Sequence, residues 1–258
     1  MPHPPARLQL QTINNHALRY PLDLAEKDYF LGAALSLIAQ SPLADVLVFK
    51  GGTAIHHCYL PQYRFSEDID FSCRVRGGVT LDEVKAALET GGLFEVQKEF
   101  TSPATIKVER LRYAGILAQP GAIKVEIDHL QNVVLPPHLL PYRNVWGLDV
   151  VLPVMDIRDI AAEKLRAASQ RARYRDFYDL YLLVEEYTPD IEEMVALLRQ
   201  KEVRQPITVK QLRENWQRVM QEKSDLRARI HYSRAIEQDD ITKLVKSLHF
   251  ESIVRASD

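Results

Sequence analysis

The pattern of apolar and polar positions predicts a mixed α/β chain. Apolar residues recur at helical spacing across residues 22–40, and Pro42 is expected to end that helix. Residues 46–49 form an apolar run rich in valine that predicts a short buried strand. Alternating positions predict three further strands, which span residues 94–100, 105–113 and 123–130. The first two of these are expected to pair in antiparallel fashion, and Thr80 and Glu83 form a capping box for a helix before them.

Helical spacing replaces alternation in the last part of the chain. Residues 130–146 contain three prolines and are expected to be loop-rich, and residues 149–154 predict a last short strand. From Asp156 onward the apolar positions follow helical spacing, and Asp156 is expected to cap the first helix. We therefore predict an α/β domain over residues 1–153 and a helical domain over residues 154–258.

A glycine turn follows the buried strand. Gly51 and Gly52 let the backbone turn sharply and leave main-chain N–H groups accessible. Thr53 is expected to cap a short helix over residues 54–60. Backbone N–H groups at the start of a helix suit a phosphate group, so the turn is a candidate phosphate site.

Two aspartates occupy alternate positions of the segment that comes next. On a strand, Asp68 and Asp70 share one face, and Ile69 and Phe71 share the other. Two carboxylates on one face repel each other unless a cation lies between them, and Mg²⁺ is usually held by one or two carboxylates plus substrate phosphates. Each feature alone is more often a plain turn or a solvated face. Their order in one strand–turn–helix–strand unit is what indicates phosphoryl or nucleotidyl transfer.

A third carboxylate is available on the strand predicted at residues 123–130. Glu126 and Asp128 share a polar face with Lys124. Either acid would complete a site beside the two aspartates if the strands are neighbours. A surface ion pair with Lys124 is the structural alternative.

A cationic run lies in the predicted helical domain. It has no acidic residue between its ends and consists of Lys164, Arg166, Arg171, Arg173 and Arg175. On one continuous helix, Lys164, Arg171 and Arg175 would form a stripe. Such cations stabilise the charge that develops on a polyphosphate leaving group, and Asp176 and Asp179 could anchor the arginines. A solvated basic helix face is the alternative.

Residues 199–234 are also basic, with ten cations, four acids and a local balance of +6. This stretch would hold an RNA backbone by charge if the cations share one surface. Solvated surface is an equally good interpretation of the charges alone.

Composition excludes several classes of protein. The 258 residues carry a net charge of −2 and two cysteines without zinc-ligand spacing, which fits a reduced cytoplasm. No run approaches the ~20 apolar residues of a membrane span, and no phosphate-binding loop of the Walker type occurs. We expect a soluble, cytoplasmic protein without membrane contact.

Two motifs resemble one enzyme family. The Gly-Gly-Thr turn and residues 64–70, which read RFSEDID, resemble polymerase-β-like nucleotidyltransferases. Within them the chain is most similar to the AbiEii/AbiGii toxin family, whose bacterial members include the tRNA-modifying MenT toxins. The distal motif of that family is matched by Glu163, Lys164, Arg171, Arg175, Asp176 and Asp179. The resemblance extends over residues 22–183, approximately.

The resemblance implies a fold and a reaction. The fold would be α/β (α+β), with a nucleotidyltransferase-type mixed sheet flanked by helices and a helical C-terminal domain. The enzyme would transfer a nucleoside monophosphate from a nucleoside triphosphate, with Mg²⁺ or Mn²⁺, to the tRNA 3′ end. A cognate antitoxin would be its protein partner.

The same resemblance implies roles for single residues. The implied metal ligands are Asp68, Asp70 and Asp128, and the position of Asp128 near the end of its strand favours it over Glu126. The catalytic set is Asp68, Asp70, Asp128, Lys164 and Asp176, with Asp128 accepting the proton of the attacking hydroxyl. The nucleotide-binding set is Gly51, Gly52, Thr53, Ser66, Lys164, Arg171 and Arg175. In the MenT toxins that the chain resembles, the hydroxyl at the position of Ser66 is a target of inactivating phosphorylation.

Two alternative functions stay open at this point. A nucleotidyltransferase that modifies an antibiotic or another small molecule would need no basic RNA surface, so the charge at residues 199–234 argues against it. A non-catalytic nucleotide-binding module in a regulatory complex would not need three candidate carboxylates, which are present.

Overall fold

The computed structural model describes residues 3–75, 77–221 and 230–254, and it divides into two compact units. One unit comprises Met1–Val133 and Pro137–Met155, and the other comprises Val134–Pro136 and Asp156–Asp258. In the part of the chain that the structure describes, no helix has the length and apolar character that a membrane crossing requires.

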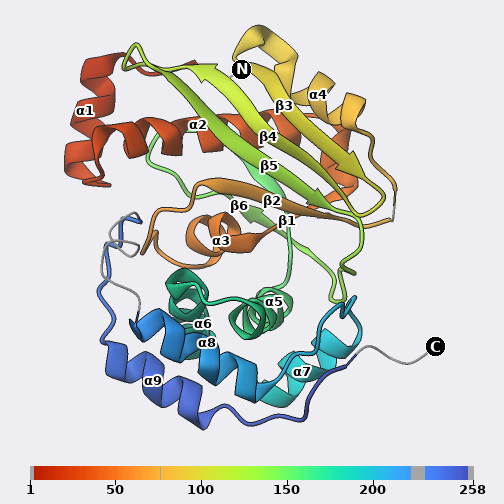
Figure 1. Cartoon of the computed structure of the whole chain (residues 1–258). Coiled ribbons are helices and arrows are strands. Elements are labelled where there is room, and N and C mark those ends of the chain that lie inside the picture. The colour runs from red at the N-terminus through yellow and green to blue at the C-terminus, as the bar shows by residue number, and fades with distance from the viewer. Residues whose placement is uncertain (1–2, 76, 222–229, 255–258) are drawn as a thin grey trace. The chain divides into compact units, whose positions relative to one another are not determined.

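The first unit is built on a seven-stranded sheet with the strand order β3-β4-β5-β2-β1-β7-β6 (Figure 1). Four pairs are antiparallel, whereas β2–β5 and β1–β7 are parallel, so the sheet is mixed as predicted. The strands are β1 (Leu47–Lys50), β2 (Asp68–Cys73), β3 (Phe94–Ser102), β4 (Thr105–Ala114), β5 (Pro120–Asp128), β6 (His138–Pro141) and β7 (Val151–Val154).

One strand was missed by the sequence pattern. Residues 130–146 were expected to be loop-rich, but β6 forms inside them and pairs with β7 from His138↔Val154 to Pro141↔Val151. The prolines conceal it, because proline removes a donor from the strand ladder. Strand β6 is the last strand of the sheet, and an edge position tolerates that loss.

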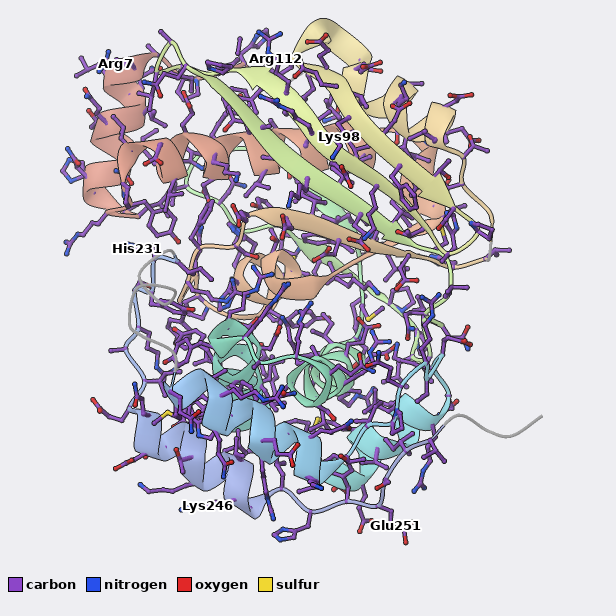
Figure 2. The ribbon with its side chains drawn as sticks, in the orientation of Figure 1. Arg7, Lys98, Arg112, His231, Lys246 and Glu251 are labelled. Atoms are coloured by element: carbon purple, nitrogen blue, oxygen red, sulfur yellow. The ribbon has the colours of Figure 1, made fainter. Side chains whose placement is uncertain are left out.

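The long helix of this unit packs on the apolar face of the sheet. Helix α2 (Leu22–Ala39) contacts β2 and β5, and Phe30 stacks on Tyr113 of β4 with 3.8 Å between the ring centroids. The buried side chains of β5 are those of Ile123, Val125 and Ile127, which confirms the predicted alternation. The opposite face of β3, β4 and β5 carries charged side chains, among them Lys98 and Arg112 (Figure 2).

The remaining helices of the first unit are short. They are α1 (Arg7–His16), α3 (Gly51–Ala54) and α4 (Leu81–Glu89), with single helical turns at Pro42–Asp45, Ile55–Tyr59 and Thr90–Gly92. Helix α4 contacts β3 and begins with the predicted capping box, in which Thr80 and Glu83 exchange hydrogen bonds.

The second unit is helical in its described part. Its helices are α5 (Ile157–Gln170), α6 (Tyr174–Tyr187), α7 (Ile191–Arg199), α8 (Val209–Gln221) and α9 (Gln238–Ser247). The Asp156 carboxylate accepts a hydrogen bond from the Arg158 amide, so the predicted cap of α5 is confirmed. Helices α5 and α6 contact each other, and Phe177 of α6 packs against Trp216 of α8.

Candidate active site

The glycine turn is shaped by the side chains that approach it. Gly51 has a φ of +78°, and a Cβ atom on it would collide with the carboxylate of Asp70. A Cβ atom on Gly52 would collide with the guanidinium of Arg64 and lie 2.8 Å from the Ser66 hydroxyl oxygen. Only glycine at both positions allows these three side chains to come this close to the backbone.

Thr53 has a different role from the predicted one. It is the third residue of α3 rather than its cap, and Lys50 occupies the N-cap position. Its side chain is fully buried, and its hydroxyl donates a hydrogen bond of 2.5 Å to the backbone carbonyl of Asp68. Thr53 therefore fixes the start of β2 against the glycine turn, and it would act on a nucleotide through its backbone or through Asp68.

Strand β2 presents both aspartates on one face, as predicted. Ile69 and Phe71 are each 1% exposed and face the core, so the alternating Asp68 and Asp70 lie on the other side of the strand. In the strand register, Asp68 is opposite Lys124 of β5, whereas Asp70 is opposite Glu126. Both aspartates belong to the charged face of the sheet.

The third predicted carboxylate lies further along the sheet. Asp128 is opposite Ser72, four residues beyond the level of Asp68, which is about 13 Å along the strands. Its position is two residues beyond Glu126, the partner of Asp70, which corresponds to a separation of about 8 Å between the backbones of Asp70 and Asp128. The structure thus brings Asp128 near Asp70 but not beside Asp68.

Asp128 is held by a lysine whose role the sequence did not predict. The ammonium of Lys50, the last residue of β1, lies 3.5 Å from Asp128 Oδ2, and β2 runs between their two strands. The other carboxylate oxygen of Asp128 accepts hydrogen bonds from the amides of Leu130 and Gln131 at 2.9 and 3.1 Å. Lys50 is 7% exposed. The sequence signal that could have identified it is a lysine at the end of an otherwise apolar strand.

Glu126, the alternative third acid, points toward β4. Its carboxylate forms an ion pair of 3.0 Å with Lys107 of β4. Glu126 is the register partner of Asp70, but its carboxylate points toward β4 and not toward β2. Asp128, which Lys50 holds, is the better-placed acid of the two.

The donor set suits a hard cation that is shared with substrate phosphates. Within the described residues, the Asp68 carboxylate has no hydrogen bond or ion pair, and no group of three His, Cys, Asp or Glu side chains is arranged around a metal position. Mg²⁺ needs no such cage, because it keeps waters and is commonly held by one or two carboxylates plus phosphate oxygens. Asp68 and Asp70 supply oxygen ligands of this kind, so they fit Mg²⁺ or Mn²⁺.

Two further side chains surround the turn. Arg64 is 2% exposed and donates from Nη1 to the backbone carbonyl of Phe65 at 2.9 Å. Ser66 is 9% exposed and precedes β2, with its hydroxyl against Gly52. The sequence presents Arg64 only as part of the RFSEDID motif, since no residue pattern predicts that an arginine will be buried.

The second unit contains a buried cluster of opposite charges. Lys164 of α5 forms ion pairs with Asp179 at 2.8 Å and with Asp176 at 3.5 Å, and both aspartates of α6 are fully buried. Arg171 contacts Asp176 with two nitrogens, at 2.7 and 3.0 Å. Burial alone would raise the pKa of Asp176, but the charges of Lys164 and Arg171 hold that pKa below its ordinary value.

The predicted cationic stripe is wrong. Helix α5 ends at Gln170, Arg171 has an extended backbone, and α6 begins at Tyr174. The side chain of Arg171 therefore contacts Asp176 in the first turn of α6. Arg175 lies on the same helix and is half-exposed. The cluster brings together Lys164, Arg171, Asp176 and Asp179, and the described contacts do not include Arg175.

The basic stretch at residues 199–234 is also different from the prediction. Lys201 is buried and forms ion pairs with Asp159 at 2.6 Å and Glu163 at 3.2 Å. Arg234 forms ion pairs with Glu185 and Glu186, which lie outside the stretch. The net charge of +6 counted along residues 199–234 is therefore not the charge of one surface. Several charged residues of the stretch lie outside the described residues, namely Glu222, Lys223, Asp225, Arg227 and Arg229.

Comparisons with known proteins identify a family and a similar fold. A family model described as the nucleotidyl transferase AbiEii toxin of type IV toxin–antitoxin systems matches residues 33–247. The fold is similar to that of MenT4, a nucleotidyltransferase toxin from Mycobacterium tuberculosis H37Rv, with a TM-score of 0.69 and 23% identity over 93% of this chain and 90% of that one. It is also similar to JHP933 from Helicobacter pylori, with a TM-score of 0.55 and 19% identity over 88% and 90% of the two chains. A sequence search among curated proteins found no significant match.

Proposed function

Since the chain belongs to the AbiEii family of nucleotidyltransferase toxins, we propose that it transfers a nucleoside monophosphate from a nucleoside triphosphate to the 3′ end of tRNA. The family establishes a nucleotidyltransferase toxin of a toxin–antitoxin system, with a nucleoside triphosphate and an antitoxin as partners. The nucleotide acceptor, the use of Mg²⁺ and a cytoplasmic location are the further parts of the proposal.

One observation carries the proposed chemistry. Asp68 and Asp70 lie on one face of β2, and Gly51 lies directly against the carboxylate of Asp70. We assign the two aspartates as ligands of Mg²⁺ or Mn²⁺. A bound divalent ion would neutralise triphosphate charge and favour the ionised acceptor oxygen.

The protein groups have separate tasks in the transfer. The hydroxyl oxygen of the acceptor attacks the α-phosphorus, a new O–P bond forms, and the bond to pyrophosphate breaks. The hydroxyl proton passes to Asp128, which two backbone amides and Lys50 hold in place. In the second unit, Lys164 and Arg171 are the cations that we propose for stabilising pyrophosphate charge, and Asp176 contacts both of them. Gly51 and Gly52 would present backbone N–H groups to the triphosphate.

The identity of the acceptor is tested by an experiment that distinguishes tRNA from small molecules and proteins. The protein is incubated with Mg²⁺, total tRNA and each α-labelled nucleoside triphosphate in turn, and periodate-oxidised tRNA is the matched control. We expect label in intact tRNA and none in oxidised tRNA, because oxidation destroys the terminal hydroxyl. Label in a small molecule, in protein or equally in both tRNA samples would refute a tRNA 3′-end acceptor.

A further inference from the structure

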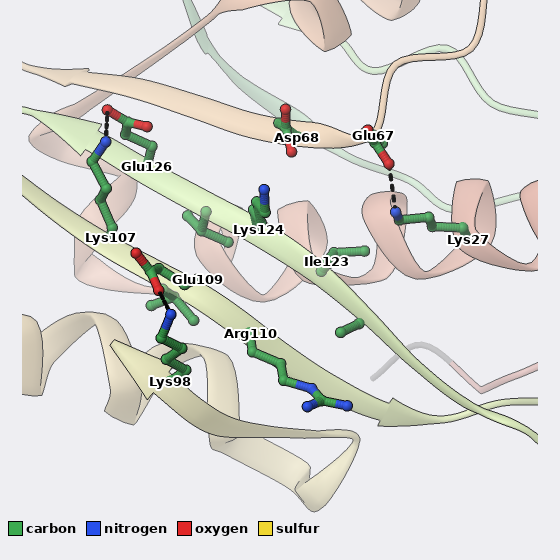
Figure 3. A pocket seen from close by; sticks show the side chains of 13 residues that line it. Lys27, Glu67, Asp68, Lys98, Lys107, Glu109, Arg110, Ile123, Lys124 and Glu126 are labelled. Carbon is green, nitrogen blue, oxygen red and sulfur yellow. Dashed lines mark hydrogen bonds and ion pairs between the residues drawn. The ribbon is translucent and has the colours of Figure 1, made fainter. Parts of the chain in front are cut away.

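The charged face of the first unit contains a pocket beside Asp68. It has a volume of about 560 Å³ and lies over β2, β3, β4 and β5 (Figure 3). Three of its lysines are already paired with acids, in the pairs Lys27–Glu67, Lys98–Glu109 and Lys107–Glu126. Arg110 and Lys124 also line it, and neither forms an ion pair with the described residues. Two exposed cations are therefore available to an anionic ligand.

These side chains form a row across four neighbouring strands. Lys98 of β3 is opposite Arg110 of β4, and Lys124 of β5 is opposite Asp68 of β2. The two halves meet because the β4–β5 register shifts between Val108 and Leu111, which sets Glu109 and Arg110 against Lys124. Figure 3 shows Lys124 between Arg110 and Asp68. Three strand spacings give the row a length of about 14 Å.

The irregular register is what places the extra cation in the row. A β-bulge adds one residue to a strand and redirects side chains, and bulges are frequent next to active sites. Here the shift gives the open face both Glu109 and Arg110, of which Glu109 pairs with Lys98. Arg110 keeps its guanidinium exposed, and that group matches a phosphate with two parallel hydrogen bonds.

An exposed aromatic ring lies on the same face. Phe100 of β3 is 51% exposed, and it is directly opposite Lys107, which lines the pocket. Opposite residues of an antiparallel pair share a face, so Phe100 belongs to the charged face and not to the core. The exposed half of this ring offers a surface on which a nucleic-acid base can stack.

We propose that this face binds the single-stranded 3′ end of the RNA acceptor, with Arg110 and Lys124 on its phosphates and Phe100 under a base. The inference rests on the proposed function and specifies which surface serves the acceptor. The row ends at β2, whose Asp68–Asp70 face is where the attacking hydroxyl has to arrive, with Asp128 near Asp70. It approaches β2 from β5, whereas the Gly51–Gly52 turn follows β1 on the other side of β2. Donor and acceptor therefore reach the aspartates from opposite sides of one strand.

The test is direct binding of a short labelled single-stranded RNA, measured by fluorescence anisotropy at several salt concentrations. The Arg110→Ala/Lys124→Ala double variant should bind about tenfold more weakly. The slope of its log affinity against log salt concentration should fall by about 1.4, because two phosphate contacts to a single strand are lost. The Phe100→Ala variant should also lose about tenfold in affinity, but with an unchanged salt slope, because stacking involves no counterion release. All three positions are exposed, so the fold should persist, which circular dichroism checks.

Matched controls change similar residues outside the pocket. Arg112→Ala removes an arginine of the same strand that pairs with Glu95, and Leu139→Ala removes an exposed apolar side chain of β6. Both should bind RNA within twofold of the wild-type protein. Unchanged RNA binding by the double variant, or the same loss in both controls, would overturn the assignment.

Two further outcomes separate this inference from the proposed function. If wild-type protein binds the RNA through these residues but transfers no nucleotide to tRNA, the proposed function fails and the surface assignment stands. If transfer to tRNA occurs and its KM for tRNA is unchanged in the double variant, the surface assignment alone fails. A higher KM for the nucleoside triphosphate with a normal KM for tRNA would make the row a donor site and would also refute it.

Discussion

Replacing Asp176 by asparagine should destabilise the second unit and abolish transfer. The substitution keeps the size of the side chain but removes a buried charge that faces Lys164 and Arg171. Removing one partner of a buried ion pair typically costs about 3–5 kcal/mol. The structure favours the lower end, about 3 kcal/mol, for two reasons. Arg171 is 45% exposed and can be hydrated, and Lys164 keeps Asp179 at 2.8 Å.

The loss should depend on pH with a definite sign. The pKa of Asp176 is held below its ordinary value, so its charged form stabilises the folded state at neutral pH. That contribution is complete above the ordinary aspartate pKa of about 3.9 and is lost as the pH falls through the lower folded value. The difference between wild type and Asp176→Asn should therefore be constant near neutral pH and shrink below about pH 4.

Urea unfolding followed by circular dichroism measures both effects. Asp240→Asn is the matched control, because Asp240 is also on a helix of this unit but forms an exposed pair with Lys243. Its stability should change by less than about 0.5 kcal/mol. Equal unfolding midpoints for wild type and Asp176→Asn at neutral pH would refute the assigned ion cluster, as would a difference that persists undiminished in acid.

Substitutions at three other positions, Lys164, Lys50 and Ser66, test single parts of the site. Lys164→Ala should abolish transfer and weaken triphosphate binding. Lys210→Ala, which removes a lysine that is 84% exposed, should change neither by more than a few-fold. Equal effects of the two substitutions would mean that only the total positive charge matters. Lys50→Met should lower the rate of transfer with little change in nucleotide affinity, since it frees Asp128, and a wild-type rate would exclude that role. Ser66→Glu should inactivate the enzyme because it adds charge and bulk against the glycine turn, whereas Ser66→Ala should largely preserve activity; an active Ser66→Glu protein would contradict this.

The sequence predicted most of what depends on local pattern. Alternation identified the strands and their buried faces, as in Ile69 and Phe71, because side chains of a strand alternate regardless of what lies elsewhere. The caps at Thr80 and Asp156 were predicted correctly, since the bond that a cap forms spans two or three residues, whereas the cap predicted at Thr53 was wrong. The sequence order of the glycine turn and the aspartates also predicted a contact that the structure contains, in which Gly51 lies against the carboxylate of Asp70.

Features that depend on tertiary partners were not predictable from pattern. The break between α5 and α6 has no proline or glycine to announce it, and it follows the pairing of Arg171 with Asp176. Counting charges treated Lys201 as a surface cation, although Asp159 and Glu163 neutralise it in the interior. The role of Lys50 could not be predicted for the same reason, because its partner is 78 residues away in the chain.

The central claim is that the Asp68–Asp70 face of β2 performs nucleotidyl transfer. The most direct measurement compares wild type and Asp70→Asn with nucleoside triphosphates labelled at either the α- or the γ-phosphate, in Mg²⁺, with tRNA as acceptor. Asp82→Asn, which changes an acid in the first turn of α4, is the control. We expect α-label but no γ-label in the acceptor, and a loss of about 10²–10⁴-fold in Asp70→Asn without unfolding, because a ligand of the charge-stabilising ion is removed. Transfer of γ-label, or full activity of Asp70→Asn, would contradict the account.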